Sequence, residues 1–481
     1  MVERTVRDRE VGSSNLPTPT ISKNQQAEYV VTLPQCHSEL DHSFRPSLFA
    51  RLLHGFAVIV LICCSLLSCR AESSDTPLRI GLAKYLKGAS AIQVSCSVDY
   101  IISDEGGQQT RMTSAYLEPI DVSIARDCIQ VKKADGKTVT IGNVLRISPE
   151  SSDGLLTIST PTRSFSQYRG ILEIRRVTDT ALQVVNELPL EDYLKGVLPA
   201  EMPSTFHFEA LKAQAIAART YSEKHRGRHK DSGYDMCDND HCQVYLGSAG
   251  ESPRTSKAVS ETAGMVAMYD GDLIMAVYSA DCGGQTQSGD DQAIGQPEPY
   301  LKSVPDCASG GKQDLCSTNR THEWTKTYTP QELEAALNVR LHPPVQGLKS
   351  VTFVGYDDSG RVKQVDLVDD KGTRSMTGVE FRRNCGYTAI RSLRMTVSAT
   401  QDGKICFAGK GWGHGVGLCQ WGAEALARDP LRYKCADILN HYYPGVTIAK
   451  LPEGSAAGRH AVVSLNDFMR RLFLTWRGKR R

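Results

Sequence analysis

The stretch LPLEDYLKGVLPAEMPSTFHFEALKAQAIAARTYS, at positions 188–222, is the part of the chain around which the rest is organised. It begins as an apolar, extended-looking run and enters a turn in which Glu201 stands between Pro199 and Pro203. Each proline fixes its own φ and biases the preceding residue away from the helical region. From Phe208 onward strong helix formers dominate and apolar residues recur at helical spacing. The sequence therefore predicts a stiff turn carrying Glu201 and then a helix over 208–224.

Glu201 is the first candidate for chemistry. A carboxyl held on a stiff turn among Leu198, Ala200 and Met202 is where desolvation would raise a pKa. The alternative is an ordinary solvated turn acid or a charge at a helix start, as most such carboxylates are. No other carboxyl in the sequence has an apolar residue on each side and a proline beyond each of them, as Glu201 has. A glycosidase mechanism that needs two carboxyl groups is therefore disfavoured.

Two further blocks carry reactive side chains. Cys237, His241 and Cys242 have the residue types of a zinc site, with Cys282 as a candidate further ligand; the alternative is a disulfide. The block GKGWGHGVG at 409–417 holds five glycines around His414, which allows close approach of backbones. It lacks the Lys-Ser/Thr ending of a phosphate-binding loop. We therefore expect a binding lip, with a structural hydrogen-bonding histidine as the alternative.

Four ordered blocks resemble the stage II sporulation protein D and amidase-enhancer family, here called SpoIID-like. They are the opening stretch, CDNDHCQVYLG at 237–247, YSADCGGQTQS at 278–288 and GKGWGHGVGLCQWGAEALA at 409–427. The resemblance extends from about Ile80 to Ile448. It implies an α+β fold, with a β-rich core, helices around a catalytic cleft and a smaller inserted β-rich subdomain.

The resemblance also implies function. Enzymes of the family are lytic transglycosylases, which cleave denuded peptidoglycan strands between MurNAc and GlcNAc and leave 1,6-anhydro-MurNAc ends. The catalytic acid maps to Glu201, and some members hold zinc at the block equivalent to 237–242. A second possibility is a non-catalytic, glycan-binding enhancer of a cell-wall amidase in a membrane complex. A third is a zinc hydrolase using His241 and His414, which no HExxH-type helix supports. The expected substrate-binding residues are Arg219, Tyr221, Gln243, Tyr245, Gly283, Thr286, His414 and Gln420.

The first 69 residues indicate export. Residues 1–50 are polar and are expected to be disordered or to precede the true start. At 56–67, FAVIVLICCSLL suits a signal-peptide core and is short for a bilayer span. It leads into Leu66-Leu67-Ser68-Cys69, which resembles a lipoprotein cleavage box with Cys69 as the lipidated residue. The alternative is an uncleaved anchor. Either predicts an extracytoplasmic, membrane-tethered protein.

Composition and length bound the remaining possibilities. The 481 residues allow two or three domains, and a net charge of +2 gives no reason to expect a nucleic-acid partner. Eleven cysteines follow Cys69, which in an exported chain predicts disulfides and leaves at least one thiol unpaired. We expect a signal peptide with lipobox at 51–69, a core at 78–325, an inserted β-rich subdomain at 326–404, a return segment at 405–450 and a basic tail at 451–481.

Overall fold

The structure is a computed structural model that describes residues 76–82, 86, 88–112, 118–160, 163–290, 294–295, 297–307 and 313–451. The lead at 1–50, the signal peptide at 51–69 with Cys69, and the tail beyond 451 lie outside the described residues. The chain divides into units 1–70 and 71–481, and the description concerns the second. Among the described residues, no helix has both the length and the apolar character needed to cross a bilayer.

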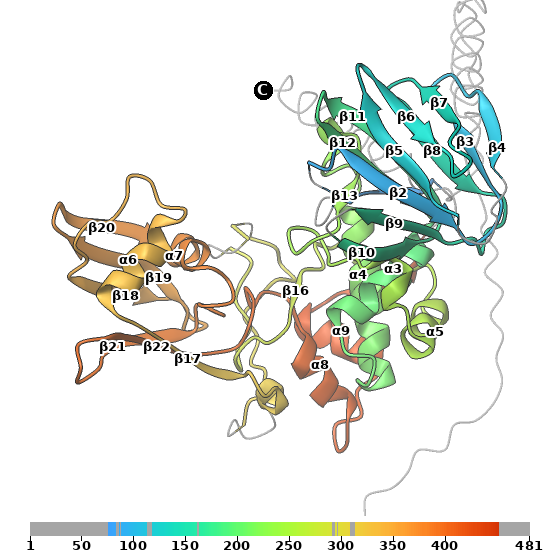
Figure 1. The fold of residues 1–481 in the computed structure, drawn as a ribbon. Coiled ribbons are helices and arrows are strands. Elements are labelled where there is room, and N and C mark those ends of the chain that lie inside the picture. The colour runs from blue at the N-terminus through green and yellow to red at the C-terminus, as the bar shows by residue number, and fades with distance from the viewer. Residues whose placement is uncertain are drawn as a thin grey trace, which may run out of the picture. The chain divides into compact units, whose positions relative to one another are not determined.

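The predicted α+β class is confirmed, and two large sheets dominate the first half of the unit (Figure 1). One sheet has the strand order β13 (Met236–Cys237), β1 (Leu78–Gly81), β12 (Ala181–Leu188), β11 (Ile171–Thr178), β8 (Val144–Pro149), β3 (Tyr100–Ser103), β4 (Gln109–Met112). The other has the order β10 (Arg163–Tyr168), β9 (Leu156–Thr160), β2 (Ala91–Cys96), β5 (Ile120–Ala125), β6 (Cys128–Lys132), β7 (Thr138–Ile141). Both sheets bury their apolar side chains in one core.

Alternation along β11 shows how these strands are specified. Leu172 and Ile174 point into the core and are fully buried. Glu173, between them, faces the other side of the sheet, where Arg79 and Arg146 bind its carboxylate at 2.7 and 2.5 Å. Successive side chains of a strand point to opposite faces, so this pattern fixes which face is buried.

Helices α3 (Leu190–Glu201), α4 (Phe208–Lys224) and α5 (Pro253–Glu261) follow the sheets (Figure 1). The prediction of an extended run and turn before Glu201 is wrong, because Glu201 is the last residue of α3. Acidic residues in the first turn favour the helix through its dipole, and α3 continues through Pro199, which cannot donate a backbone hydrogen bond. Pro203 comes after the C-cap Met202, where the helix has already ended.

Helix α4 spans the predicted residues. Its buried Arg219 binds Glu191 of α3 in a bidentate ion pair, with nitrogen–oxygen distances of 2.8 and 2.7 Å. Two later helices, α8 (Gln420–Ala427) and α9 (Cys435–Tyr442), pack against α4 (Figure 1). The ring of Trp421 meets that of Phe206 edge-on at 4.8 Å between centroids. The C-terminal part of the chain thus completes the core that the central stretch begins.

Short sheets join distant segments around this helical layer. A hairpin forms from β14 (Met265–Tyr269) and β15 (Asp272–Leu273), and β24 (Thr447–Lys450) pairs with β14. Strands β16 (Tyr278–Ser279) and β23 (Leu418–Cys419) pair in parallel. The second pairing places the block at 278–288 beside the glycine-rich block.

A second hydrophobic cluster, which includes Phe381 and Phe407, is built between Trp324 and Phe407. Its strands are β17 (Glu323–Tyr328), β22 (Ile405–Lys410), β21 (Met395–Ala399), β18 (Ser350–Tyr356), β19 (Val362–Asp369) and β20 (Gly372–Thr377). Helices α6 (Pro330–Asn338) and α7 (Gly378–Cys385) both begin with a capping box. Each box satisfies two otherwise unpaired donors, which sets where the helix starts.

Candidate functional site

Glu201 ends α3 with its carboxyl turned into the protein. The backbone amide of Val244 donates to Glu201 Oε1 at 2.8 Å. Burial raises the pKa of the Glu201 carboxyl above its ordinary value, and the nearby Asp240 carboxylate adds to the rise, whereas the Val244 amide opposes it. Desolvation disfavours the charged form of an acid. The carboxyl is therefore biased toward the protonated state that a general acid needs.

Two side-chain donors lie beside this carboxyl. The Tyr278 hydroxyl and the Gln420 amide nitrogen are buried and make no close hydrogen bond among the described residues. Both still interact with the Glu201 carboxyl as donors, which lowers its pKa against the effect of burial. A bound polar molecule could therefore share these donors with Glu201.

His414 lies next to this group. Its Nδ1 accepts a hydrogen bond from the Val416 amide at 3.0 Å, and burial lowers the pKa of His414 to about 4. The ring is therefore neutral at ordinary pH, and it interacts with the backbone of Tyr278. Gly413 has φ 120°, and a Cβ there would come within 2.6 Å of Ser279. Glycine at position 413 therefore allows the glycine-rich block at 409–417 to pack against β16.

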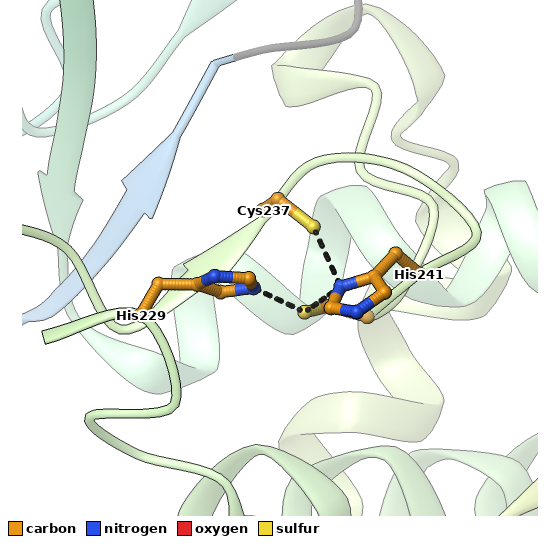
Figure 2. Close-up of side chains that lie close together, drawn as sticks. His229, Cys237 and His241 are labelled. Atoms are coloured by element: carbon orange, nitrogen blue, oxygen red, sulfur yellow. Dashed lines mark hydrogen bonds between the residues drawn. The ribbon is translucent and has the colours of Figure 1, made fainter. Parts of the chain in front are cut away.

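The predicted zinc block forms a four-membered cluster (Figure 2). Cys237 Sγ and Cys242 Sγ each lie 3.6 Å from His241 Nδ1, and His229 Nε2 lies 3.4 Å from Cys242 Sγ. All four ligating atoms lie within 4.8 Å of one another. A tetrahedral zinc ion with its usual Zn–S and Zn–N bond lengths places sulfur and nitrogen about 3.6 Å apart. The residues therefore fit a zinc ion.

His229 is the member of this cluster that the sequence does not predict, and Cys282, the expected further ligand, belongs to a different cluster. His229 stands eight positions before Cys237, outside the compact block. It reaches the cluster because β13 pairs in parallel with β1 and so folds the preceding loop back. None of the eleven described cysteines is joined in a disulfide, so the expected disulfides are not found among the described residues. Many of those thiols converge with imidazole or carboxylate groups instead.

Three predicted substrate-binding residues are held by contacts within the protein, although Gln243 Oε1 has no hydrogen-bond partner among the described residues. Arg219 is fully buried in its ion pair with Glu191. The Gln243 amide donates to the Ala218 carbonyl at 3.1 Å, and the Tyr245 hydroxyl donates to Asn186 at 2.9 Å. Both side chains are buried. These contacts support α3 and α4, and a role of the three residues in substrate binding stays a prediction.

Gly283 and Thr286 are also enclosed. The Gly283 carbonyl accepts a hydrogen bond from Arg394, and the Thr286 hydroxyl accepts one from the Val304 amide at 2.8 Å. Thr286 is fully buried. Tyr221 is nearer the site, because its ring meets Tyr278 edge-on at 6.4 Å between centroids, but its hydroxyl accepts from Arg228. Of the eight expected contacts, His414 and Gln420 are those placed beside Glu201 and its neighbour Tyr278.

A separate hollow of about 510 Å³ lies in the smaller β-rich part. Its lining residues are Glu323, Trp324, Thr325, Tyr356, Gly360, Arg394, Met395, Thr396, Ala408, Gly409 and Lys410. Its lining does not include Glu201, so we place the candidate site by the Glu201 carboxyl and the donors beside it rather than by the hollow.

Comparisons with known proteins match these blocks. A family model described as Stage II sporulation protein matches residues 178–269, which include Glu201 and the zinc-type cluster. A second model, described as a domain of unknown function, matches residues 311–417.

Three relatives match over longer spans. An uncharacterized protein of Brachyspira hyodysenteriae is 35% identical over 284 residues, 59% of this chain and 72% of that protein. The amidase enhancer of Bacillus subtilis is 34% identical over 347 residues, 64% of this chain and 47% of that protein. The stage II sporulation protein D of the same organism is 29% identical over 339 residues, 67% of this chain and 89% of that protein.

Proposed function

The chain belongs to the SpoIID-like family, and from that premise we propose that it is a lytic transglycosylase acting on denuded peptidoglycan strands. The reaction cleaves between MurNAc and GlcNAc and leaves 1,6-anhydro-MurNAc ends. Glu201 is the acid and the base of the reaction. One observation carries this proposal: burial raises the pKa of the half-buried Glu201 carboxyl, and the side-chain donors of Tyr278 and Gln420 lie beside it.

A single carboxyl suffices for this chemistry. Protonated Glu201 donates its proton to the glycosidic oxygen as the bond from MurNAc C1 to that oxygen breaks. The resulting carboxylate accepts the proton of the MurNAc C6 hydroxyl, whose oxygen bonds to C1 and closes the anhydro ring. Glu201 is thereby returned to its protonated form, and no water is consumed. Tyr278 and Gln420 are placed to donate hydrogen bonds to the sugar or to the transient carboxylate.

The zinc-type cluster supports this site in the proposal. His229, Cys237, His241 and Cys242 would supply all four ligands of a tetrahedral ion, which is the pattern of a structural zinc site. Bound zinc would hold the loop that continues through Cys242 to Val244. Val244 in turn donates its amide proton to Glu201, so the cluster positions the carboxyl without taking part in the reaction.

The test is digestion of denuded glycan strands by the purified full chain. The wild type is expected to release 1,6-anhydro-muramyl products, detected by mass spectrometry. Glu201→Gln should lower the rate by about 10²–10⁴, the usual contribution of a general acid–base group. The amide keeps the size of the side chain and an oxygen for the Val244 amide.

Asp240→Asn is the matched control. Asp240 is exposed and is close enough to raise the pKa of Glu201. A one-carboxyl mechanism retains anhydro products in this variant. Reducing ends in place of anhydro ends, together with loss of activity in Asp240→Asn, would show a two-carboxyl hydrolase and refute the proposal.

A second candidate function rests on the similarity to the amidase enhancer. In that case the chain binds glycan and stimulates a separate cell-wall amidase in a membrane complex. A wild type that releases no anhydro product but accelerates a purified cell-wall amidase would establish it, and Glu201→Gln would then leave the stimulation intact.

We also propose that the protein works outside the cytoplasm, tethered by lipidated Cys69 or by an uncleaved signal anchor. The apolar run at 56–67 and the cysteine at its end support this placement. Peptidoglycan lies on that side of the membrane, so the placement agrees with the proposed substrate.

A further inference from the structure

A second cluster of metal-ligating side chains lies apart from the zinc-type block. It consists of Cys282, Asp306, Cys316 and Cys419, and here it is called the Cys3Asp cluster. One ligating atom of each residue lies within 4.8 Å of all the others. All four residues are fully buried. Three different segments supply them: the bend after β16, the stretch 306–316, and the residue that caps α8.

The spacing of these atoms fits one small ion. Cys282 Sγ lies 3.9 Å from Cys316 Sγ and 3.0 Å from Asp306 Oδ2. Tetrahedral zinc with Zn–S bonds of about 2.3 Å places two sulfurs about 3.8 Å apart and a sulfur and an oxygen about 3.5 Å apart. Shifts of about half an ångström would therefore complete the ligand shell. Three thiolates and one carboxylate would fill all four coordination positions of a tetrahedral zinc ion, which is typical of a structural site.

Neighbouring groups hydrogen-bond to the side chains of the Cys3Asp cluster and fix their orientation. The Tyr442 hydroxyl donates to Asp306 Oδ1 at 2.7 Å and leaves Oδ2 facing the sulfurs. Backbone amides of Cys282 and Gly422 point at Cys419 Sγ, at 3.3 and 3.4 Å. Such outer contacts orient metal ligands and stabilise thiolate charge.

A disulfide does not account for the cluster. A bond between Cys282 and Cys316 would leave the buried Cys419 thiol and the Asp306 carboxylate facing a pair of neutral sulfurs. Burying a carboxylate without a cation or full hydrogen bonding is costly. Cys316 also belongs to a second group, with Asp281 and His322. In that group both ring nitrogens of His322 lie 3.1 Å from carboxylates, those of Asp281 and Asp314, which already satisfy the imidazole.

We propose that Cys282, Asp306, Cys316 and Cys419 bind a second, structural zinc ion. The ion ties the parallel pair β16–β23 and the start of α8 to the stretch 306–316. Tyr278 lies in β16, and Gln420 directly follows Cys419. The second zinc therefore fixes the two donors beside Glu201. This inference does not depend on whether Glu201 is catalytic.

The experiment is metal analysis of the full chain purified without added zinc. Cys316→Ala is compared with Cys385→Ala, a buried thiol in the second hydrophobic cluster that belongs to neither metal cluster. Cys316→Ala should contain one zinc ion per chain fewer than Cys385→Ala. Cys237→Ala should lose the zinc ion of the other cluster, the one formed with His229, His241 and Cys242. The double variant Cys237→Ala/Cys316→Ala should therefore lose both zinc ions.

Measurements on the wild type keep the test decisive if a variant fails to fold. Peptide mapping under non-reducing conditions should find Cys282, Cys316 and Cys419 as free thiols after metal removal. Cobalt substitution should give the intense charge-transfer absorption of a site with three thiolates. A Cys282–Cys316 disulfide in the wild type, or equal zinc content in Cys316→Ala and Cys385→Ala, would overturn the proposal.

Discussion

At the scale of single residues, the environment of Glu201 makes a prediction about stability that is separate from activity. Its carboxyl pKa is raised above the ordinary value of 4.5, chiefly by burial. The folded state therefore holds this proton more tightly than the unfolded state. Stability contributed by the site falls as pH rises from about 4.5 through the folded pKa, and it stays low above that.

Glu201→Gln removes this cost. The variant is expected to melt at a higher temperature than the wild type at pH 7, and the gain should vanish near pH 4, where both states of the wild type are protonated. Thermal denaturation followed by circular dichroism between pH 4 and pH 8 measures it. A variant that is less stable than the wild type across this range would contradict the raised pKa.

Glu209, in the first turn of α4, is the matched control with the opposite sign. Burial raises its pKa, but hydrogen bonds from Lys212 and from the Cys435 amide outweigh this and lower the pKa below 4.5. Its stabilisation is present above about pH 4.5 and is lost as pH falls through the folded pKa. Glu209→Gln should therefore destabilise the protein at pH 7, with a smaller effect in acid.

At the scale of elements, local sequence patterns predict α4 but not α3, and they do not predict which distant residues meet. The length of α4 follows from its own helix formers and apolar stripe. Helix α3 was missed because two prolines weighed against it, although Tyr193, Leu194, Val197 and Leu198 already form a helical stripe. His229 and Asp306 gave no local signal, since pairing of distant strands and loops brings them to their clusters. Glu201 and the compact block at 237–242 could be proposed as candidates from the sequence because the residues of each lie close together in the chain.

The loop from β13 to Val244 carries the next prediction. His229→Ala removes one of the four ligands and should abolish zinc binding at that cluster. The Val244 amide should then exchange with deuterium about tenfold faster, which corresponds to about 1.4 kcal/mol of local stability. Hydrogen exchange read by mass spectrometry on the peptide containing Val244 measures this.

Lys230→Ala is the control for the loop, because Lys230 is the exposed neighbour of His229 and contributes no ligand. It should leave both zinc content and exchange unchanged. Equal exchange at Val244 in the two variants would mean that the cluster does not hold the residue that contacts Glu201.

At the scale of the described molecule, one buried arginine connects the smaller hydrophobic cluster to the loop beside the site. Arg361 is 1% exposed. Its Nη2 donates to the Cys282 carbonyl at 2.7 Å, and its Nη1 donates to the Gln285 carbonyl at 3.0 Å. The side chain of Gln287 donates to Asp357 in the same hairpin at 2.8 Å. These contacts make the hairpin between β18 and β19 a brace for the segment 282–287.

Arg361→Ala should therefore uncouple the two clusters. Loss of the guanidinium leaves two buried carbonyls unsatisfied and should cost about 2–4 kcal/mol. Differential scanning calorimetry is expected to show one transition for the wild type and two for the variant, with the smaller cluster unfolding first. Arg383→Ala, an exposed arginine of α7, should melt as the wild type does. A single unshifted transition in Arg361→Ala would mean that other contacts carry the coupling, and that the smaller cluster does not brace the loop through this side chain.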